Sequence, residues 1–134
     1  MEAEALGNTA AEAAELSRRR RVLFVCSQNR LRSPTAARLC GRRSDLEVRS
    51  AGTDRDANVR VTAELLEWAD VVFVMERRHR NVIHKRFRSL YERKRIVCLY
   101  IPDQFDFMDP ALVELLRARL ALHLPSRPPQ DVLA

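Results

Sequence analysis

The chain lacks several features that define whole classes of protein. It has only 3 glycines in 134 residues and no low-complexity stretch, which argues against a fibrous or disordered protein. No apolar run approaches the roughly 20 residues that a membrane-spanning helix needs. The amino-terminal segment does not show the basic-then-apolar order of a signal peptide. These absences predict a soluble, cytoplasmic protein with no membrane partner.

Cysteine is also scarce, and its 3 residues are dispersed as Cys26, Cys40 and Cys98. An odd, unclustered set predicts neither a disulfide framework nor a zinc site. We therefore expect reduced thiols, no metal and no other cofactor. Cys40 and Cys98 are expected to be buried structural residues, with a resolving thiol at Cys40 as the alternative.

Lysine is almost missing, because Lys85 and Lys94 are the only two among 24 basic residues. With 18 acidic residues the formal net charge is +6, and arginine supplies nearly all of the positive charge. Arginine suits bidentate contact with carboxylate or phosphate, so the surplus indicates either an anionic partner or a solvated arginine-rich surface. Nucleic acid is disfavoured as a partner, since no aromatic residues alternate with the basic ones.

The length allows one domain. Residues 1–20 are rich in alanine and glutamate and are interpreted as an N-terminal extension, and residues 126–134 as a C-terminal tail. Residues 21–125 form the predicted domain.

Strand and helix patterns alternate four times within that domain. Short apolar runs predict strands at 22–25, 46–51, 70–75 and 96–99, and helical patterns follow at 34–41, 59–68, 76–87 and 111–124. Ser33 and Asp109 are the expected caps of the first and last helices. Continuous apolar strands alternating with helices predict an α/β fold: three layers, with a four-stranded parallel sheet and helices on both faces. In such sheets ligands bind at the carboxyl ends of the strands.

The loop after the first strand reads Cys26-Ser-Gln-Asn-Arg-Leu-Arg32-Ser33. Backbone N–H groups in a tight strand-to-helix loop form an anion-binding nest, to which the helix N-terminus adds positive potential. Such a setting favours the thiolate of Cys26, while Arg32 can bind two phosphoryl oxygens and Ser33 can hydrogen-bond the sulfur. The alternative is that Cys26 is a small apolar residue at a strand end.

The run VLFVCSQNRLRSP, together with Ser50-Ala-Gly-Thr53, resembles the low-molecular-weight protein tyrosine phosphatase family, in its short bacterial branch, over about residues 21–125. The resemblance implies hydrolysis of phosphate monoesters through a phosphocysteine intermediate. It implies that Cys26 is the nucleophile, that Arg32 clamps the transition state and that Asn29 maintains the loop shape. The phosphate-binding positions would be Ser27, Gln28, Asn29, Arg30, Leu31, Arg32 and Ser33.

The family also places an aspartate in a loop near the C-terminal end. The matching position is Asp103, which would protonate the leaving oxygen and later activate water. Asp106 is the reserve candidate, whereas Asp109 is better explained as a helix cap. The implied partners are a phosphorylated protein or a small aryl phosphate, and inorganic phosphate or another oxyanion.

The chain departs from the family pattern at several points. Gln28 stands where the family usually has glycine, and Leu31 replaces a second loop cysteine. The tyrosine pair beside the general acid is absent, and the segment after Thr53 is short. Gln28 and the missing tyrosine pocket leave open a non-catalytic phosphate- or phosphopeptide-binding module. A thiol-dependent arsenate reductase is a further alternative, in which Cys40 or Cys98 would have to replace the near thiol that Leu31 removes. His79 and the basic helix around it are expected to lie on the surface; the alternatives are that His79 lines the site and that the helix attracts an acidic or phosphorylated partner.

Overall fold

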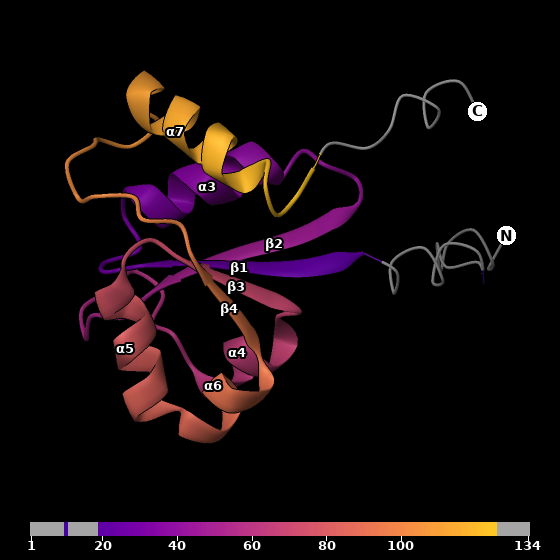
Figure 1. Ribbon diagram of the computed structural model, residues 1–134, viewed down its shortest axis with the longest axis vertical. Helices are drawn as coiled ribbons and strands as arrows, with labels where there is room; N and C mark the ends of the chain where they lie inside the picture. Colours follow the sequence, from indigo (N-terminus) through magenta and orange to yellow (C-terminus); the bar gives the residue numbers. More distant parts are fainter. Residues whose placement is uncertain (1–9, 11–18, 126–134) are drawn as a thin grey trace, which may run out of the picture.

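The computed structural model describes residue 10 and residues 19–125 (Figure 1). The predicted tail at 126–134 lies outside the described residues, as does nearly all of the predicted extension at 1–20. Arg20 already belongs to the first strand.

Four parallel strands form one sheet with the order β2-β1-β3-β4, which confirms the predicted sheet. The strands are β1 (Arg20–Cys26), β2 (Leu46–Gly52), β3 (Val71–Val74) and β4 (Arg95–Cys98). β1 lies between β2 and β3, and its last residue, Cys26, pairs with Gly52 at the end of β2. The loop after β1 therefore emerges at the middle of the carboxyl edge of the sheet.

Helices cover both faces of the sheet, as predicted (Figure 1). On one face lie α3 (Arg32–Cys40) and α7 (Pro110–Leu120), and on the other lie α4 (Ala63–Trp68), α5 (Arg77–Arg86) and α6 (Arg88–Arg93). Alternate residues of β1 enter the two cores, because successive side chains of a strand point to opposite faces. Burial on both faces explains why β1 and β3 read as continuous apolar runs.

Two helix starts differ from the prediction. Ser33 is not a cap, because α3 already begins at Arg32 and Ser33 lies inside its first turn. The helix predicted from residue 59 begins only at Ala63, where Thr62 caps it by accepting a hydrogen bond from the Leu65 N–H (3.2 Å). The capping role of Asp109 is confirmed, since its carboxylate accepts from the Ala111 N–H at 2.9 Å.

The expectation of a buried Cys98 is wrong. β4 is an edge strand, and Cys98 is half-buried. Cys40 is buried as expected. In the part of the chain that the structure describes, no helix has the length and apolar character to cross a membrane.

Candidate active site

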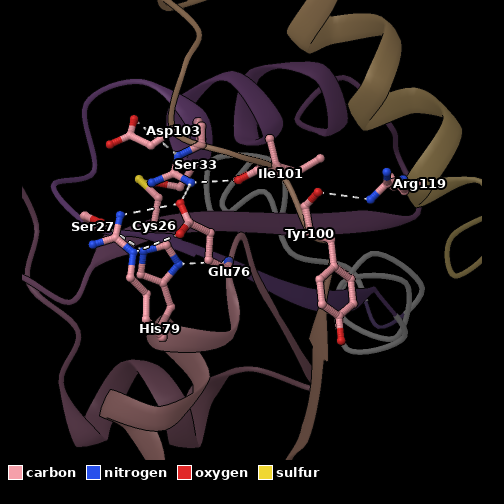
Figure 2. Close-up of polar contacts among 11 residues, drawn as sticks. Cys26, Ser27, Ser33, Glu76, His79, Tyr100, Ile101, Asp103 and Arg119 are labelled. Atoms are coloured by element: carbon pink, nitrogen blue, oxygen red, sulfur yellow. Dashed lines mark hydrogen bonds and ion pairs between the residues drawn. The ribbon is translucent and has the colours of Figure 1, made fainter.

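The loop after β1 surrounds the thiol of Cys26 (Figure 2). Cys26 is only 3% exposed, and its Sγ lies 3.0 Å from the Oγ of Ser33. Ser33 is fully buried at the start of α3, so the helix brings a hydroxyl directly onto the sulfur. A thiolate at this position would accept a hydrogen bond from Ser33.

Asn29 fixes the shape of the loop. Its φ is 58°, in the left-handed region that asparagine tolerates better than most residues. The side-chain Nδ2 of Asn29 donates to the Oγ atoms of Ser33 (3.0 Å) and Ser50 (2.9 Å). Its backbone carbonyl accepts from the Nδ2 of Asn58 at 3.0 Å. Gln28 is not among the described residues with positive φ. The left-handed turn of the loop is thus made at Asn29, and glutamine at position 28 needs no strained backbone.

Gly52 lets the loop pack closely against β2. A Cβ at this position would lie 2.5 Å from the carbonyl oxygen of Ser27 and 2.9 Å from the nitrogen of Asn29, closer than van der Waals contact allows. The chain after Gly52 donates backbone hydrogen bonds to the loop, from Thr53 to Cys26 (2.9 Å) and from Asp54 to Ser27 (2.8 Å). One of the three glycines in the chain is therefore required at the base of the site.

Arg32 is buried to 2% exposure at the floor of the same site. Its Nη1 donates to the carbonyl of Ile101 at 2.7 Å and to the carboxylate of Glu76. Its Nε lies 3.8 Å from Oδ1 of Asp103. Because both hydrogen bonds to described residues use Nη1, the guanidinium keeps its Nε and Nη2 donors for two oxygens of an anion.

Glu76 connects Arg32 to the start of α5. Its carboxylate accepts from Arg32 and, at 2.9 Å, from the Nε of Arg78. Burial alone would raise the pKa of Glu76, but the hydrogen bonds from Arg78 and Arg32 outweigh it and lower that pKa. Glu76 is thus an anion at neutral pH, and it orients the arginine of the loop.

His79 is buried against the loop, so the expectation of a surface histidine is wrong. It is 1% exposed, and its Nε2 lies 2.9 Å from the Oγ of Ser27 (Figure 2). Its Nδ1 accepts the backbone N–H of Glu76 at 3.0 Å. Burial, together with the positive charges of Arg32 and Arg78, lowers the pKa of His79 to about 4. The neutral ring carries its proton on Nε2, which donates to Ser27 and leaves the Ser27 hydroxyl proton for another acceptor.

Sequence reasoning missed Glu76 and favoured a surface position for His79. The two residues form a capping box at the start of α5, in which each side chain accepts from the backbone of the other. The sequence gives little signal for this box, because the usual pattern is Ser or Thr followed three residues later by Glu or Gln, whereas here Glu76 is followed by His79.

The segment that carries Asp103 is held at its base. Tyr100 has a φ of 57°, and its carbonyl accepts from Nη1 of Arg119 at 3.1 Å, while the Ile101 N–H donates to the carbonyl of Met75 at 2.7 Å. In Figure 2 the Tyr100 side chain points away from Cys26, whereas Asp103 lies above Cys26. The Asp103 side chain is 54% exposed, so its carboxyl reaches both solvent and the site.

A pocket of about 200 Å³ lies over the thiol. It brings together the predicted Cys26, Arg32 and Asp103, which come from the end of β1, the start of α3 and the segment before α7. Its lining residues are Cys26, Ser27, Gln28, Arg30, Leu31, Arg32, Asp54, Arg78 and Asp103.

Three predicted residues lie outside this lining. Asn29 in the loop and Ser33 in the first turn of α3 are buried, and Asp106 is exposed on the segment that leads to α7. Within the described ranges, no three histidine, cysteine, aspartate or glutamate side chains gather in a group able to hold a metal ion.

A cysteine at the end of the central parallel strand, followed by a tight loop and a buried arginine at the helix start, defines a small α/β protein with an anion-binding loop. No protein-family model matches the sequence, and no curated protein does either. Solved structures do match.

The YwlE arginine phosphatase from Geobacillus stearothermophilus is 25% identical, with 78% of this chain and 92% of that chain covered and a TM-score of 0.61. The tyrosine phosphatase Wzb from Escherichia coli K30, in complex with phosphate, is 20% identical, with 74% and 91% covered and a TM-score of 0.60. The low molecular weight protein tyrosine phosphatase SP-PTP from Streptococcus pyogenes is 14% identical, with 78% and 93% covered and a TM-score of 0.64. The chain has the fold of the low molecular weight protein tyrosine phosphatases, which confirms the resemblance seen in its sequence.

Proposed function

We propose that this protein is a cysteine-dependent phosphatase that hydrolyses phosphate monoesters through a phosphocysteine intermediate. The observation that carries the proposal is the meeting of Cys26, Arg32 and Asp103 around one pocket. A thiol nucleophile, a charge clamp and a carboxyl acid are the three groups that this reaction needs. Residues 21–125 are the proposed phosphatase domain, and the reduced cytoplasm is its proposed setting.

In the first step the Cys26 thiolate attacks phosphorus, and the bond from phosphorus to the ester oxygen breaks. The Asp103 carboxyl gives its proton to the departing oxygen. Charge on the transferring phosphoryl group is stabilised by the Nε and Nη2 donors of Arg32, by loop N–H groups and by the N-terminus of α3. Ser33 stabilises the thiolate before attack.

In the second step water attacks the phosphocysteine. The Asp103 carboxylate takes a proton from that water, the bond between phosphorus and sulfur breaks, and Cys26 leaves as a thiolate hydrogen-bonded to Ser33. Inorganic phosphate is released, and Asp103 is again protonated for the next cycle.

The proposed substrates are a phosphotyrosine protein or a small aryl phosphate. No aromatic side chain lines the pocket among the described residues, and Phe105, beside the acid, packs against the apolar core instead. Because the matching structures include arginine and tyrosine phosphatases, the substrate panel needs a phosphoarginine peptide beside a phosphotyrosine peptide.

The test is hydrolysis of p-nitrophenyl phosphate by wild type, Cys26→Ser, Asp103→Asn and Asp106→Asn. We expect turnover by wild type, none by Cys26→Ser, and a loss of about 10²–10⁴-fold in kcat for Asp103→Asn, the usual range for a general acid. An unchanged rate for Asp103→Asn would move this role to Asp106. Phosphate binding without hydrolysis by wild type would instead identify a non-catalytic binding module.

A further inference from the structure

Three guanidinium groups line the pocket over Cys26, and carboxylates compensate two of them. Arg32 pairs with Glu76 and faces Asp103. Arg78 also pairs with Glu76, and its pKa is raised first by that hydrogen bond and further by the negative charges of Asp103 and Asp54. Carboxylates thus compensate both Arg32 and Arg78.

Arg30 is different, because all of its hydrogen-bond acceptors are neutral. Its Nε donates to Oδ1 of Asn58 (3.3 Å), its Nη1 to Oε1 of Gln28 (3.0 Å) and its Nη2 to the backbone carbonyl of Asp56 (3.1 Å). Among the described residues, no carboxylate forms an ion pair with Arg30. Of the three arginines that line the pocket, Arg30 alone has no paired carboxylate among the described residues.

Arg30 is also held in position for binding. Each of its three nitrogens makes a hydrogen bond, and these use three of the five N–H donors of a guanidinium. The remaining donors belong to a group whose orientation is already fixed, so little side-chain entropy would be lost when an anion binds.

Arg30 is exposed, unlike the residues expected to hold the phosphoryl group. The phosphate is expected over Cys26 and Arg32, which are buried, whereas Arg30 is exposed at the rim. An anion that reaches Arg30 would therefore belong to the part of the substrate beyond the phosphoryl group.

We propose that Arg30 binds a second anionic group, a carboxylate or phosphate, carried by the substrate next to the ester that is hydrolysed. This inference rests on the proposed function and narrows its substrate class. Two sources offer the same chemistry: an acidic residue adjacent to phosphotyrosine in a protein, or an acidic substituent on a small aryl phosphate. Arg30 selects between substrates, while Cys26 and Asp103 carry out the reaction.

Binding is measured on the full chain with Cys26→Ser, so that the result does not depend on turnover. One arm uses two fluorescent phosphotyrosine peptides that differ only by glutamate or glutamine beside the phosphotyrosine, read by anisotropy at low ionic strength. The second arm uses 4-carboxyphenyl phosphate and 4-carbamoylphenyl phosphate as competitors. Each pair is compared in the Cys26→Ser background alone and with Arg30→Gln, Arg30→Lys or the control Arg55→Gln. Arg55 is exposed on the neighbouring loop and does not line the pocket.

We expect the acidic member of at least one pair to bind about three- to tenfold more tightly, as a preorganised charge-assisted contact at an exposed rim allows. Arg30→Gln should abolish this preference, Arg30→Lys should keep part of it, and Arg55→Gln should keep all of it. A preference in the peptide arm alone identifies a protein substrate, and one in the aryl arm alone a small molecule. Equal binding within both pairs, or a preference that survives Arg30→Gln, overturns the inference. If the wild type does not hydrolyse p-nitrophenyl phosphate, the proposed function is overturned instead. Failure of the inference and failure of the proposed function are therefore distinguishable.

Discussion

Nε2 of His79 lies 2.9 Å from the Oγ of Ser27, across 52 positions of the chain. The backbone N–H of Glu76 donates to the other ring nitrogen, which places the proton of the neutral imidazole on Nε2. Ser27 therefore accepts from His79, and its own proton can point into the pocket that it lines. A helix on one face of the sheet thus sets the orientation of a hydroxyl beside the thiol.

The first prediction is that His79 makes folding stability depend on pH. Its native pKa of about 4 lies below the ordinary value of 6.5, so below pH 6.5 the unfolded chain binds a proton that the native state does not. Stability contributed by neutral His79 is present above pH 6.5 and is lost as the pH falls toward 4. Between pH 7 and pH 5 the loss is about 2 kcal/mol.

Urea unfolding at pH 7, 6 and 5 measures this loss. His79→Gln should flatten the dependence, whereas the control His84→Gln, on the exposed side of the same helix, should retain the wild-type slope. Parallel curves for wild type and His79→Gln would show that the buried ring does not couple folding to protonation.

The second prediction concerns Glu76→Gln. Removal of the carboxylate leaves the buried guanidinium of Arg32 without its main anion and should cost about 1–3 kcal/mol of stability. Turnover should fall about tenfold because Arg32 loses its fixed orientation. Inhibition by inorganic phosphate should not weaken, since a negative charge has been removed beside an anion site.

The matched control is Glu67→Gln. Glu67 pairs with Arg93 and Lys94 on the surface, where its side chain is 58% exposed, so its loss should leave stability almost unchanged. If both variants behave alike in unfolding and kinetics, Glu76 does not position the arginine.

The third prediction is that Gly52→Ala damages the loop. The added Cβ would meet the backbone of Ser27 and Asn29 and the Cβ of Ala57, and overpacking of this kind costs about 1–3 kcal/mol. Stabilisation by phosphate in a thermal unfolding assay should be reduced. Combining the change with Ala57→Gly removes one close contact but leaves both backbone contacts, so it should not rescue the protein. Full rescue would show that the clash with the loop backbone is not the cause.

The fourth prediction separates Cys26 from Cys40. Burial raises the pKa of the Cys40 thiol, which disfavours its reactive form. Cys40→Ala should keep phosphatase turnover at a cost of about 1 kcal/mol in stability, and iodoacetamide should alkylate Cys26 before Cys40. Arsenate-dependent thiol oxidation that disappears in Cys40→Ala would favour a thiol relay instead.

The sheet and the loop could be predicted because their signals are local. Strands buried on both faces must be apolar throughout, and the nucleophile and arginine lie within seven consecutive residues, Cys26 to Arg32. The residues that support them come from elsewhere in the chain. Gly52 is required by a neighbouring strand, and His79 is buried only because α5 packs against the loop. The arginine-rich composition of this helix predicts that His79 is exposed to solvent. The packing of α5 against the loop buries it instead.

The central claim is that Cys26 carries the phosphoryl group during turnover. The most direct measurement is mass spectrometry of the Asp103→Asn protein mixed with p-nitrophenyl phosphate and quenched in neutral denaturant, with Cys26→Ser as the control. We predict one added phosphoryl group on the peptide that contains Cys26 and hydrolysis abolished in the control. A phosphoryl group on another residue, or wild-type hydrolysis by Cys26→Ser, would contradict the account.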